Sequence, residues 1–445
     1  MFTQLRSLWR YPNNQVDKRI FGVAGVLLVA FSVSNAVPAA QNFGKSQSAF
    51  PASVCPSKLG DGTTTAFLPK YKSSVRHVAK KSISFYKSLS STENISSNAL
   101  LVEGNPATSF VLNNSGNGIG AVLCQSGNAD QWFVGGAGGL TSKDQLDIVN
   151  SGLSPAQVDI IGYSSKQVLP VISLVVPANS DRPVLLDALV PGEDSVVLHV
   201  ITRAGRVTSF LFDQRKKGLS SLGTDFVNSQ DTPSKDLVIP ALMQSSNGKV
   251  ASTIRFLVPG NLDANVKLTI NSGDGAFTPL GFDGRLIPHG KVIDIPLADL
   301  TSSTPMSIHV ESDQPLVAAA LTSLQGADFA WAIPVSPLTQ LSLNFTGLNP
   351  KFVFTGSSID VAINWKSASG RSMSDHVTGS DIAFWNPGTA GVRSISFTSK
   401  TRNPVYGGTI LRNSSGSQLA YLPLGAGAVL EKSTLPIVDV RSLSH

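Results

Sequence analysis

Short apolar runs rich in β-branched residues recur along the chain, and glycine, proline or acidic residues bound each run. Two of them stand close together: residues 196–201 read VVLHVI and residues 207–212 read VTSFLF. β-Branched and aromatic residues favour strands, and the intervening segment, RAGR at residues 203–206, predicts a hairpin loop. Beyond the N-terminal region no stretch shows a sustained helical apolar period, so we expect an all-β fold.

The pattern around these runs returns about 110 residues later. Leu198-His199-Val200 is matched by Ile308-His309-Val310, because 309 − 199 = 110, and a partial third copy occupies residues 422–435. Solenoid repeats are shorter, about 20–50 residues, whereas an immunoglobulin-like sandwich has about 100. We therefore predict tandem immunoglobulin-like β-sandwich domains, arranged as separate beads behind one N-terminal transmembrane helix.

Composition supports this class and suggests its subdivision. The chain has 39 glycines and 26 prolines in 445 residues, and its acidic residues are 24 Asp against 5 Glu. Asp favours turns while Glu favours helices. The expected segments are a basic cytoplasmic head (1–19), a transmembrane signal-anchor (20–40), a stalk (41–54), a disulfide-closed basic β domain (55–145) and three β-sandwich repeats (146–240, 241–330 and a partial 331–445).

The uncharged segment at residues 20–40 determines the predicted location. Its 21 residues are long enough to span a bilayer. The head before it carries four basic residues and one acidic residue, which favours a cytoplasmic N-terminus. We expect a single-pass protein of the cell membrane with its bulk extracytoplasmic. The strongly apolar core at residues 20–33 is short, so secretion after cleavage near Ala39 is the alternative.

The chain contains two cysteines, Cys55 and Cys124, and both lie on the predicted exported side. An even pair in an oxidising compartment predicts one disulfide, which closes a loop of 124 − 55 = 69 residues. A catalytic thiol is the less favoured alternative. Two distant cysteines without a neighbouring Cys or His ligand make a poor metal site, so we expect neither metal nor cofactor.

The most basic run lies between these cysteines. Its candidate contact residues for polymer or lipid are Lys70, Lys72, Arg76, Lys80, Lys81 and Lys87. Because the run follows soon after the predicted membrane segment, it could contact anionic cell-wall polymer or lipid headgroups. The alternative is the ordinary solvated face of a small domain. We do not expect an exported protein to bind nucleic acid, although the net charge of +6 would permit it.

No catalytic residue can be assigned, and we expect that the protein is not an enzyme. Nucleophile-elbow and zinc-protease motifs are absent from the sequence. His199 and His309 hold equivalent repeat positions, which favours a structural role, and Asp187 and Asp213 read as turn residues. Two carboxylates of a glycoside hydrolase need only meet in space, so a cryptic cell-wall hydrolase is an alternative.

Several features recur together in this order: the basic head, one hydrophobic segment, Cys55-Pro56, Trp132 before a glycine run, Asn150-Ser151-Gly152 after a strand, and LLDALVPG at residues 185–192. In this combination the chain resembles a family of actinobacterial envelope proteins of unknown function, best over residues 55–227. The resemblance implies a single-pass protein with an extracellular β-rich part, often encoded near envelope glycosyltransferases, and it implies no catalytic residues.

These observations together predict a structural or interaction module of the bacterial cell envelope. Its expected partner is a cell-wall polymer or an envelope membrane protein. A glycan-binding accessory to an envelope glycosyltransferase is the first alternative.

Overall fold

The structure, a computed structural model, describes residues 52–70, 72–78, 83–103, 108–243, 250–297, 304–324 and 326–425. The chain divides into two compact units, Met1–Lys45 and Ser46–His445, and all described residues belong to the second. In this described part, no helix has the length and apolar character needed to cross a membrane. The predicted head, the membrane segment at residues 20–40 and most of the stalk lie outside the described residues.

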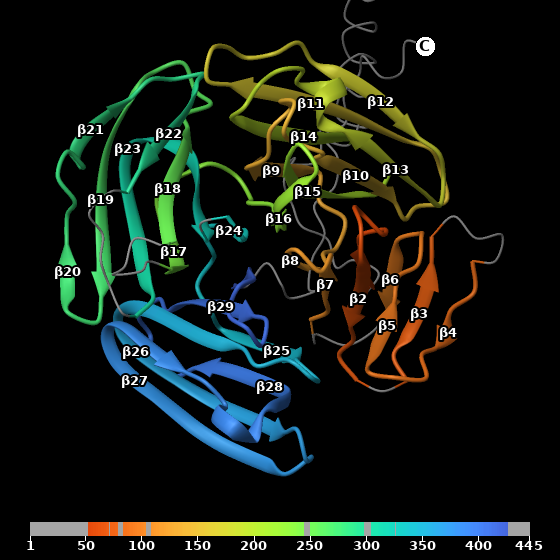
Figure 1. Cartoon of the computed structure of the whole chain (residues 1–445), viewed down its shortest axis with the longest axis vertical. Coiled ribbons are helices and arrows are strands. Elements are labelled where there is room, and N and C mark those ends of the chain that lie inside the picture. Colours follow the sequence, from red (N-terminus) through yellow and green to blue (C-terminus); the bar gives the residue numbers. More distant parts are fainter. Residues whose placement is uncertain are drawn as a thin grey trace, which may run out of the picture. The chain divides into compact units, whose positions relative to one another are not determined.

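The described chain is almost entirely β, as the sequence predicts. Its strands form four groups that are consecutive in sequence, and we name them modules 1 to 4, at residues 52–124, 130–227, 234–332 and 340–424. Figure 1 shows them in sequence colours from orange to blue. The helical elements among the described residues are short: α2 (Leu186–Leu189) and the 3-10 helix η1 (Gly388–Ala390).

Module 1 contains two four-stranded sheets, ordered β1-β6-β3-β4 and β5-β2-β7-β8. Its strands are β1 (Ala52–Cys55), β2 (Thr63–Phe67), β3 (Ser74–His77), β4 (Tyr86–Lys87), β5 (Thr92–Asn94), β6 (Leu100–Glu103), β7 (Phe110–Asn114) and β8 (Ile119–Leu123). The predicted disulfide between Cys55 and Cys124 is confirmed, and it joins β1 in one sheet to the end of β8 in the other.

Module 2 also pairs two four-stranded sheets, ordered β12-β11-β14-β9 and β13-β10-β15-β16. Its strands are β9 (Asp130–Val134), β10 (Gln145–Asn150), β11 (Ala156–Ser164), β12 (Ile172–Val176), β13 (Ser180–Leu185), β14 (Val196–Ala204), β15 (Val207–Lys217) and β16 (Ser220–Val227). Because β9 pairs with β14, this module begins before the expected boundary at residue 146.

The predicted hairpin at residues 203–206 is wrong. Strands β14 and β15 do not pair; the chain passes there from one sheet of module 2 to the other. Gly205 makes the change of direction with φ of 92°, and a Cβ on it would lie 2.5 Å from the Cβ of Ala156. Glycine adopts such a backbone conformation without steric cost, so it allows the close crossing.

Module 3 also has eight strands, but they form one eight-stranded sheet. Its strands are β17 (Ser234–Leu242), β18 (Val250–Leu257), β19 (Ala264–Ser272), β20 (Gly275–Phe277), β21 (Asp283–Ile287), β22 (Val292–Pro296), β23 (Met306–Leu324) and β24 (Asp328–Ala332). The long β23 pairs with β19 through its first half and with β18 through its second half, so it joins these two groups of strands into one sheet without a loop. The expected boundary at residue 240 falls inside β17, which pairs with β23.

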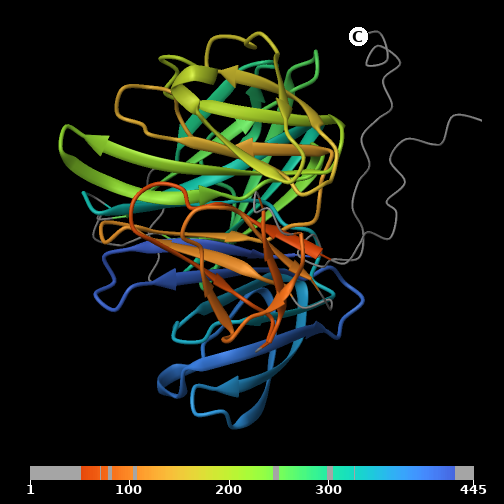
Figure 2. The ribbon, with the colours of Figure 1, turned by 90° about the vertical axis from the view of Figure 1, so that its right-hand side faces the viewer.

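Module 4 is one six-stranded sheet in which the long strands β26 and β27 form a hairpin (Figure 2). Its strands are β25 (Gln340–Asn344), β26 (Lys351–Ser367), β27 (Ser372–Trp385), β28 (Val392–Ser399), β29 (Tyr406–Arg412) and β30 (Leu419–Leu424). Residues 426–445, the rest of the expected last domain, lie outside the described residues.

The last strands of the four modules, β8, β16, β24 and β30, contact one another in cyclic order. Each is an edge strand of its own sheet, and an unpaired edge leaves backbone N–H groups that need partners. Side chains supply those partners for β8: Ile119 N–H donates to Asp328, Ala121 N–H to Asp225 and Leu123 N–H to Asn228. Gly120 permits the approach, since a Cβ there would lie 2.9 Å from the Cα of Asp225.

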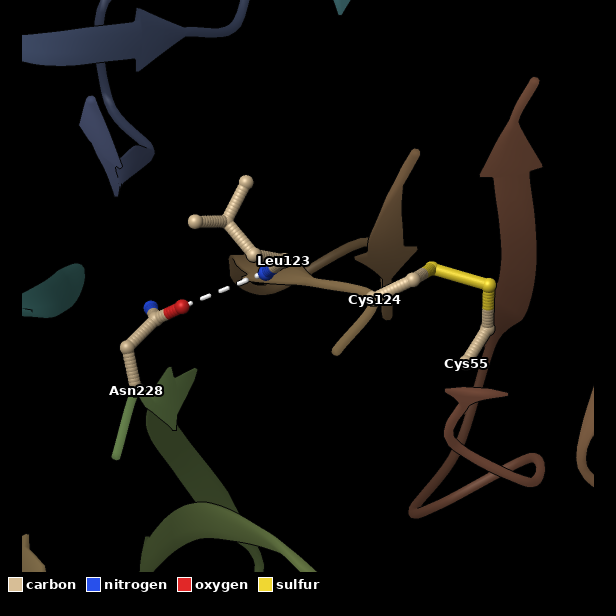
Figure 3. The surroundings of a disulfide bond; sticks show 4 residues. All are labelled: Cys55, Leu123, Cys124 and Asn228. Carbon is tan, nitrogen blue, oxygen red and sulfur yellow. Dashed lines mark hydrogen bonds between the residues drawn. A yellow bond between two sulfur atoms is a disulfide. The ribbon is translucent and has the colours of Figure 1, made fainter. Parts of the chain in front are cut away.

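This arrangement replaces the expected separate beads with shared cores. One buried cluster joins module 1 to Phe210, Phe212 and Phe226 of module 2, a second joins modules 1 and 4, and the largest extends from module 2 through module 3 into module 4. At β8 two links lie on successive residues, because Cys124 forms the disulfide while Leu123 bonds to Asn228 of module 2 (Figure 3). The described modules therefore fold as one body.

Candidate functional site

A cleft between modules 1 and 2 is the best candidate for a binding site. It has a volume of about 540 Å³, which is in the range of pockets that hold a small molecule or one group of a larger ligand. Small and apolar residues and two arginines form its surface. Its lining includes Arg76, Ile83, Phe85, Leu153 and Arg206, together with the glycine and serine loop at residues 151–154.

Module 1 provides the floor of the cleft. Val54, Leu101 and Arg76 are directly opposite one another across β1, β6 and β3, so their side chains project from the same face of this sheet. The guanidinium carbon of Arg76 lies 5.6 Å from the ring centre of Phe85, within the range of a cation–π contact. The floor is thus apolar except for one arginine.

Module 2 provides a wall, and Asn150 fixes its shape. The amide nitrogen of Asn150 donates to the carbonyl oxygens of Ser154, Val176 and Pro177, and its amide oxygen accepts the N–H of Gly152. Asn150 is fully buried at the end of β10. The Asn-x-Gly signature noted in the sequence therefore has a structural reason: its side chain holds the loop that lines the cleft.

Arg76 is the buried cation of this cleft. Only 5% of the residue is exposed, and burial lowers the pKa of its guanidinium. It donates to Asn179 Oδ1 and, at 3.5 Å, to the carbonyl oxygen of Ser151, while its Nε has no partner among the described residues. Arg255, in contrast, is paired with Asp294 at 2.7 Å. Arg76 has no carboxylate partner in the described part of the chain.

Arg206 is the second cation of the cleft and sits at its mouth. It is exposed, and its backbone carbonyl accepts the N–H of Ser151 at 3.2 Å. Within the described ranges its guanidinium has neither an ion pair nor a hydrogen bond, so it is available to a ligand. Ile83 and Leu153, which are 54% and 70% exposed, add apolar surface to the same rim.

The structure separates the predicted basic contact residues. Arg76 lines the cleft and is buried, so the interpretation of it as a solvated surface residue is wrong. Lys70, Lys72 and Lys87 are exposed but do not line the cleft, and Lys80 and Lys81 lie outside the described residues. Arg206 was not predicted as a contact residue. The sequence feature that could have indicated it is the basic RAGR segment at residues 203–206, whose last arginine lies in the cleft between module 2 and module 1.

A separate set of charged residues is buried between modules and is already satisfied. Asp213, predicted as a turn residue, is instead fully buried in β15, where it accepts hydrogen bonds from Arg215 and from the indole of Trp331, each at 2.8 Å. Burial, followed by the nearby Asp213, raises the pKa of Asp144 well above its usual value. These groups bond to one another and to the backbone, which is a structural role.

The histidines in equivalent repeat positions also have equivalent contacts. His199 Nε2 lies 2.7 Å from Asp130 Oδ1, and His309 Nε2 lies 3.0 Å from Asp236 Oδ1. Asp130 and Asp236 belong to β9 and β17, the first strands of modules 2 and 3. Each pair joins the first strand of its module to a neighbouring strand, as expected for a structural role. In the described part of the chain no cluster of three or more potential metal ligands occurs.

The family comparison covers more than half of the chain. A family model described as "Family of unknown function (DUF5719)" matches residues 105–373. The chain belongs to this family. The match includes the module 2 side of the cleft, with Asn150, Leu153 and Arg206, but not Arg76 or Phe85. No curated protein matches the chain.

Solved structures give only distant similarity. The chain is similar to Thermotoga maritima 1070 (16% identity, TM-score 0.21, covering 22% of this chain and 92% of that one) and to Streptomyces avermitilis α-L-rhamnosidase complexed with L-rhamnose (7%, TM-score 0.13, covering 83% and 55%). A tetra-tandem repeat from the extending region of a large adhesion protein has 10% identity and a TM-score of 0.11, covering 85% and 96%. Similarity at this level carries no argument about function.

Proposed function

We propose that this protein is an extracytoplasmic interaction module of the bacterial cell envelope, anchored by residues 20–40, that binds an anionic ligand in the cleft between modules 1 and 2 and catalyses no reaction. The observation that carries the proposal is Arg76, a buried cation without a carboxylate partner among the described residues, which shares a cleft with the unpaired Arg206.

The buried positive charge of Arg76 costs free energy unless an anion lies beside it. Burying a cation without a counter-charge costs free energy, and proteins usually offset this cost with an acidic neighbour, as Asp294 does for Arg255. At Arg76 a carboxylate or phosphate of a ligand would take that role. Guanidinium groups suit such anions because they donate two parallel hydrogen bonds.

The chemistry of the lining supports binding rather than catalysis. The residues that line the cleft include serines, glycines, arginines and apolar side chains, but among the described residues no carboxylate, histidine or cysteine. General acid–base and nucleophilic mechanisms need such groups within hydrogen-bond reach of the reacting atom. Asp213 and Asp225, two buried acids outside the cleft, bond to Trp331 inside the protein.

Three features support the envelope location. The disulfide suits an oxidising compartment, the basic head and apolar segment suit export, and the sequence resembles actinobacterial envelope proteins. In that setting the first candidates for the ligand are anionic cell-wall polymer and the anionic headgroups of the membrane.

The test is a binding assay with both envelope anions. The Ser46–His445 unit, which contains all the described core residues, is mixed with isolated cell-wall polymer or with anionic phospholipid vesicles, at low and at high salt. We expect salt-sensitive binding to one of them that is weakened by Arg206→Gln. Arg402→Gln, which removes an exposed charge far along the chain in module 4, is the matched control. Absence of binding to both anions, or equal effects of the two variants, would refute the proposal.

A further inference from the structure

We infer that the ligand of this cleft is the phosphate headgroup of an anionic membrane phospholipid, with the adjoining acyl or glycerol part of the lipid on the rim formed by Ile83 and Leu153. The inference rests on the proposed function and names its ligand.

The first reason is the combination of side chains at the cleft mouth. Arg206 is unpaired within the described ranges, and beside it Leu153 is 70% exposed and Ile83 54% exposed. A hydrophilic cell-wall polymer would cover the arginine but would leave these apolar side chains without a partner. A phospholipid places an anion and an apolar surface a few ångströms apart, so it matches both.

The second reason is the charge deeper in the site. Arg76 lies beside Phe85 and above an apolar floor that contains Val54 and Leu101. This environment is largely apolar, so an anion that enters it gains more from the guanidinium than it would at a solvated lysine. Phosphate oxygens accept hydrogen bonds from guanidinium donors in the required geometry.

The third reason is the position of the cleft along the chain. Ala52 belongs to the lining, and only residues 41–51 separate it from the predicted membrane segment. Those 11 residues span at most about 40 Å when fully extended. In the proposed anchored protein this short tether limits the distance that Ala52 can move from the membrane, which raises the effective concentration of headgroups at module 1.

The experiment uses the Ser46–His445 unit, which lacks the membrane segment and so cannot attach through it. Flotation with phosphatidylglycerol vesicles is compared with flotation on phosphatidylcholine vesicles of the same size. We expect binding to the anionic vesicles that falls roughly fivefold with Arg206→Gln and about tenfold with Leu153→Ser. The matched controls are Arg402→Gln and Leu280→Ser, which change an exposed arginine and an exposed leucine outside the cleft.

The possible outcomes separate the two proposals. Loss of vesicle binding with both cleft variants, but not with their controls, supports the phospholipid. Binding to isolated cell-wall polymer that needs Arg206 but not Leu153, without vesicle binding, overturns this inference and leaves the proposed function intact. Failure of both probes overturns both. Inorganic phosphate at millimolar concentration is added as a competitor: displacement by phosphate alone, with no effect of Leu153→Ser, would show a free-phosphate site and also overturn the inference.

Discussion

Asp328 of module 3 accepts the backbone N–H of Ile119 of module 1 at 3.2 Å, although the two residues are 209 positions apart in sequence. The same carboxylate accepts the N–H of Thr224 in module 2 at 3.1 Å and the N–H of Leu419 in module 4 at 3.0 Å. One side chain thus bonds to all three other modules. It satisfies edge N–H groups that would otherwise be buried without partners.

Replacing Asp328 should therefore destabilise the whole described body. Asp328→Ala leaves three buried N–H groups unpaired, and each costs about 1–3 kcal/mol, so we expect a loss of at least about 3 kcal/mol in the free energy of unfolding. Asp328→Asn keeps one acceptor oxygen and should cost less. Urea unfolding gives the comparison, with the exposed Asp274→Asn as control. Equal midpoints for Asp328→Ala and wild type would contradict the proposed role.

The buried carboxylates also predict a pH dependence. Burial raises the pKa of Asp328 to about 7, and burial likewise raises the pKa of Asp147 to about 7 from a usual value of 3.8. The folded state therefore binds these protons more tightly than the unfolded state does. By linkage, the free energy of unfolding is greatest at acid pH and falls as the pH rises from about 4 to about 7. We expect a higher urea midpoint at pH 5 than at pH 8.

Asp147→Asn should remove part of that slope. Its carboxylate accepts both the N–H and the hydroxyl of Ser57, at 2.9 and 2.8 Å, so the asparagine can keep one acceptor without titrating. A wild-type midpoint that is equal at the two pH values, or higher at pH 8, would show that these carboxylates ionise normally.

Asn150 and Asn344 make a matched pair for testing the cleft wall. Asn150 holds the 151–154 loop, while the buried Asn344 joins module 4 to module 1 through the carbonyl oxygens of Leu68 and Ser91, each at 2.9 Å. Either asparagine replaced by alanine leaves buried carbonyls unpaired and should cost about 2 kcal/mol in unfolding free energy. Only Asn150→Ala should also reduce vesicle binding. Equal vesicle binding by the two variants would show that the 151–154 loop does not contribute to the binding site.

The stability of the unliganded protein should depend little on Arg76 and strongly on Arg255 when each is replaced by leucine. Arg76→Leu removes a buried cation that lacks a carboxylate partner among the described residues, so the unliganded protein should change stability by no more than about 1 kcal/mol while ligand binding is lost. Arg255→Leu breaks bonds to Asp294, Gly136 and Val196 and should cost at least about 3 kcal/mol. Thermal unfolding without ligand measures both. A large loss at Arg76 would mean that its role is structural.

Local sequence patterns were sufficient for the all-β class and the disulfide. β-Branched runs and turn residues have local conformational preferences, so they predict strands directly from the sequence. Two cysteines on the predicted exported side likewise predict a disulfide, because that compartment is oxidising. The equivalence of His199 and His309 followed in the same way, because a repeated strand puts equal residues at equal register.

Tertiary structure alone decided how the repeats meet. The RAGR segment has the composition of a hairpin, yet the chain crosses between sheets there, because the partner of a strand depends on which edge is free and not on the loop. Asp213 looks like a turn residue in sequence, since nothing local indicates that a distant strand brings Trp331 to it. Nothing local marks Asp328 as the acceptor for the N–H groups of Ile119 and Leu419 either. Arg76 and Arg206 likewise share a cleft only because module 1 packs against module 2. Such long-range contacts depend on how the modules pack and on which N–H groups at strand edges need hydrogen-bond partners. No local sequence pattern encodes either.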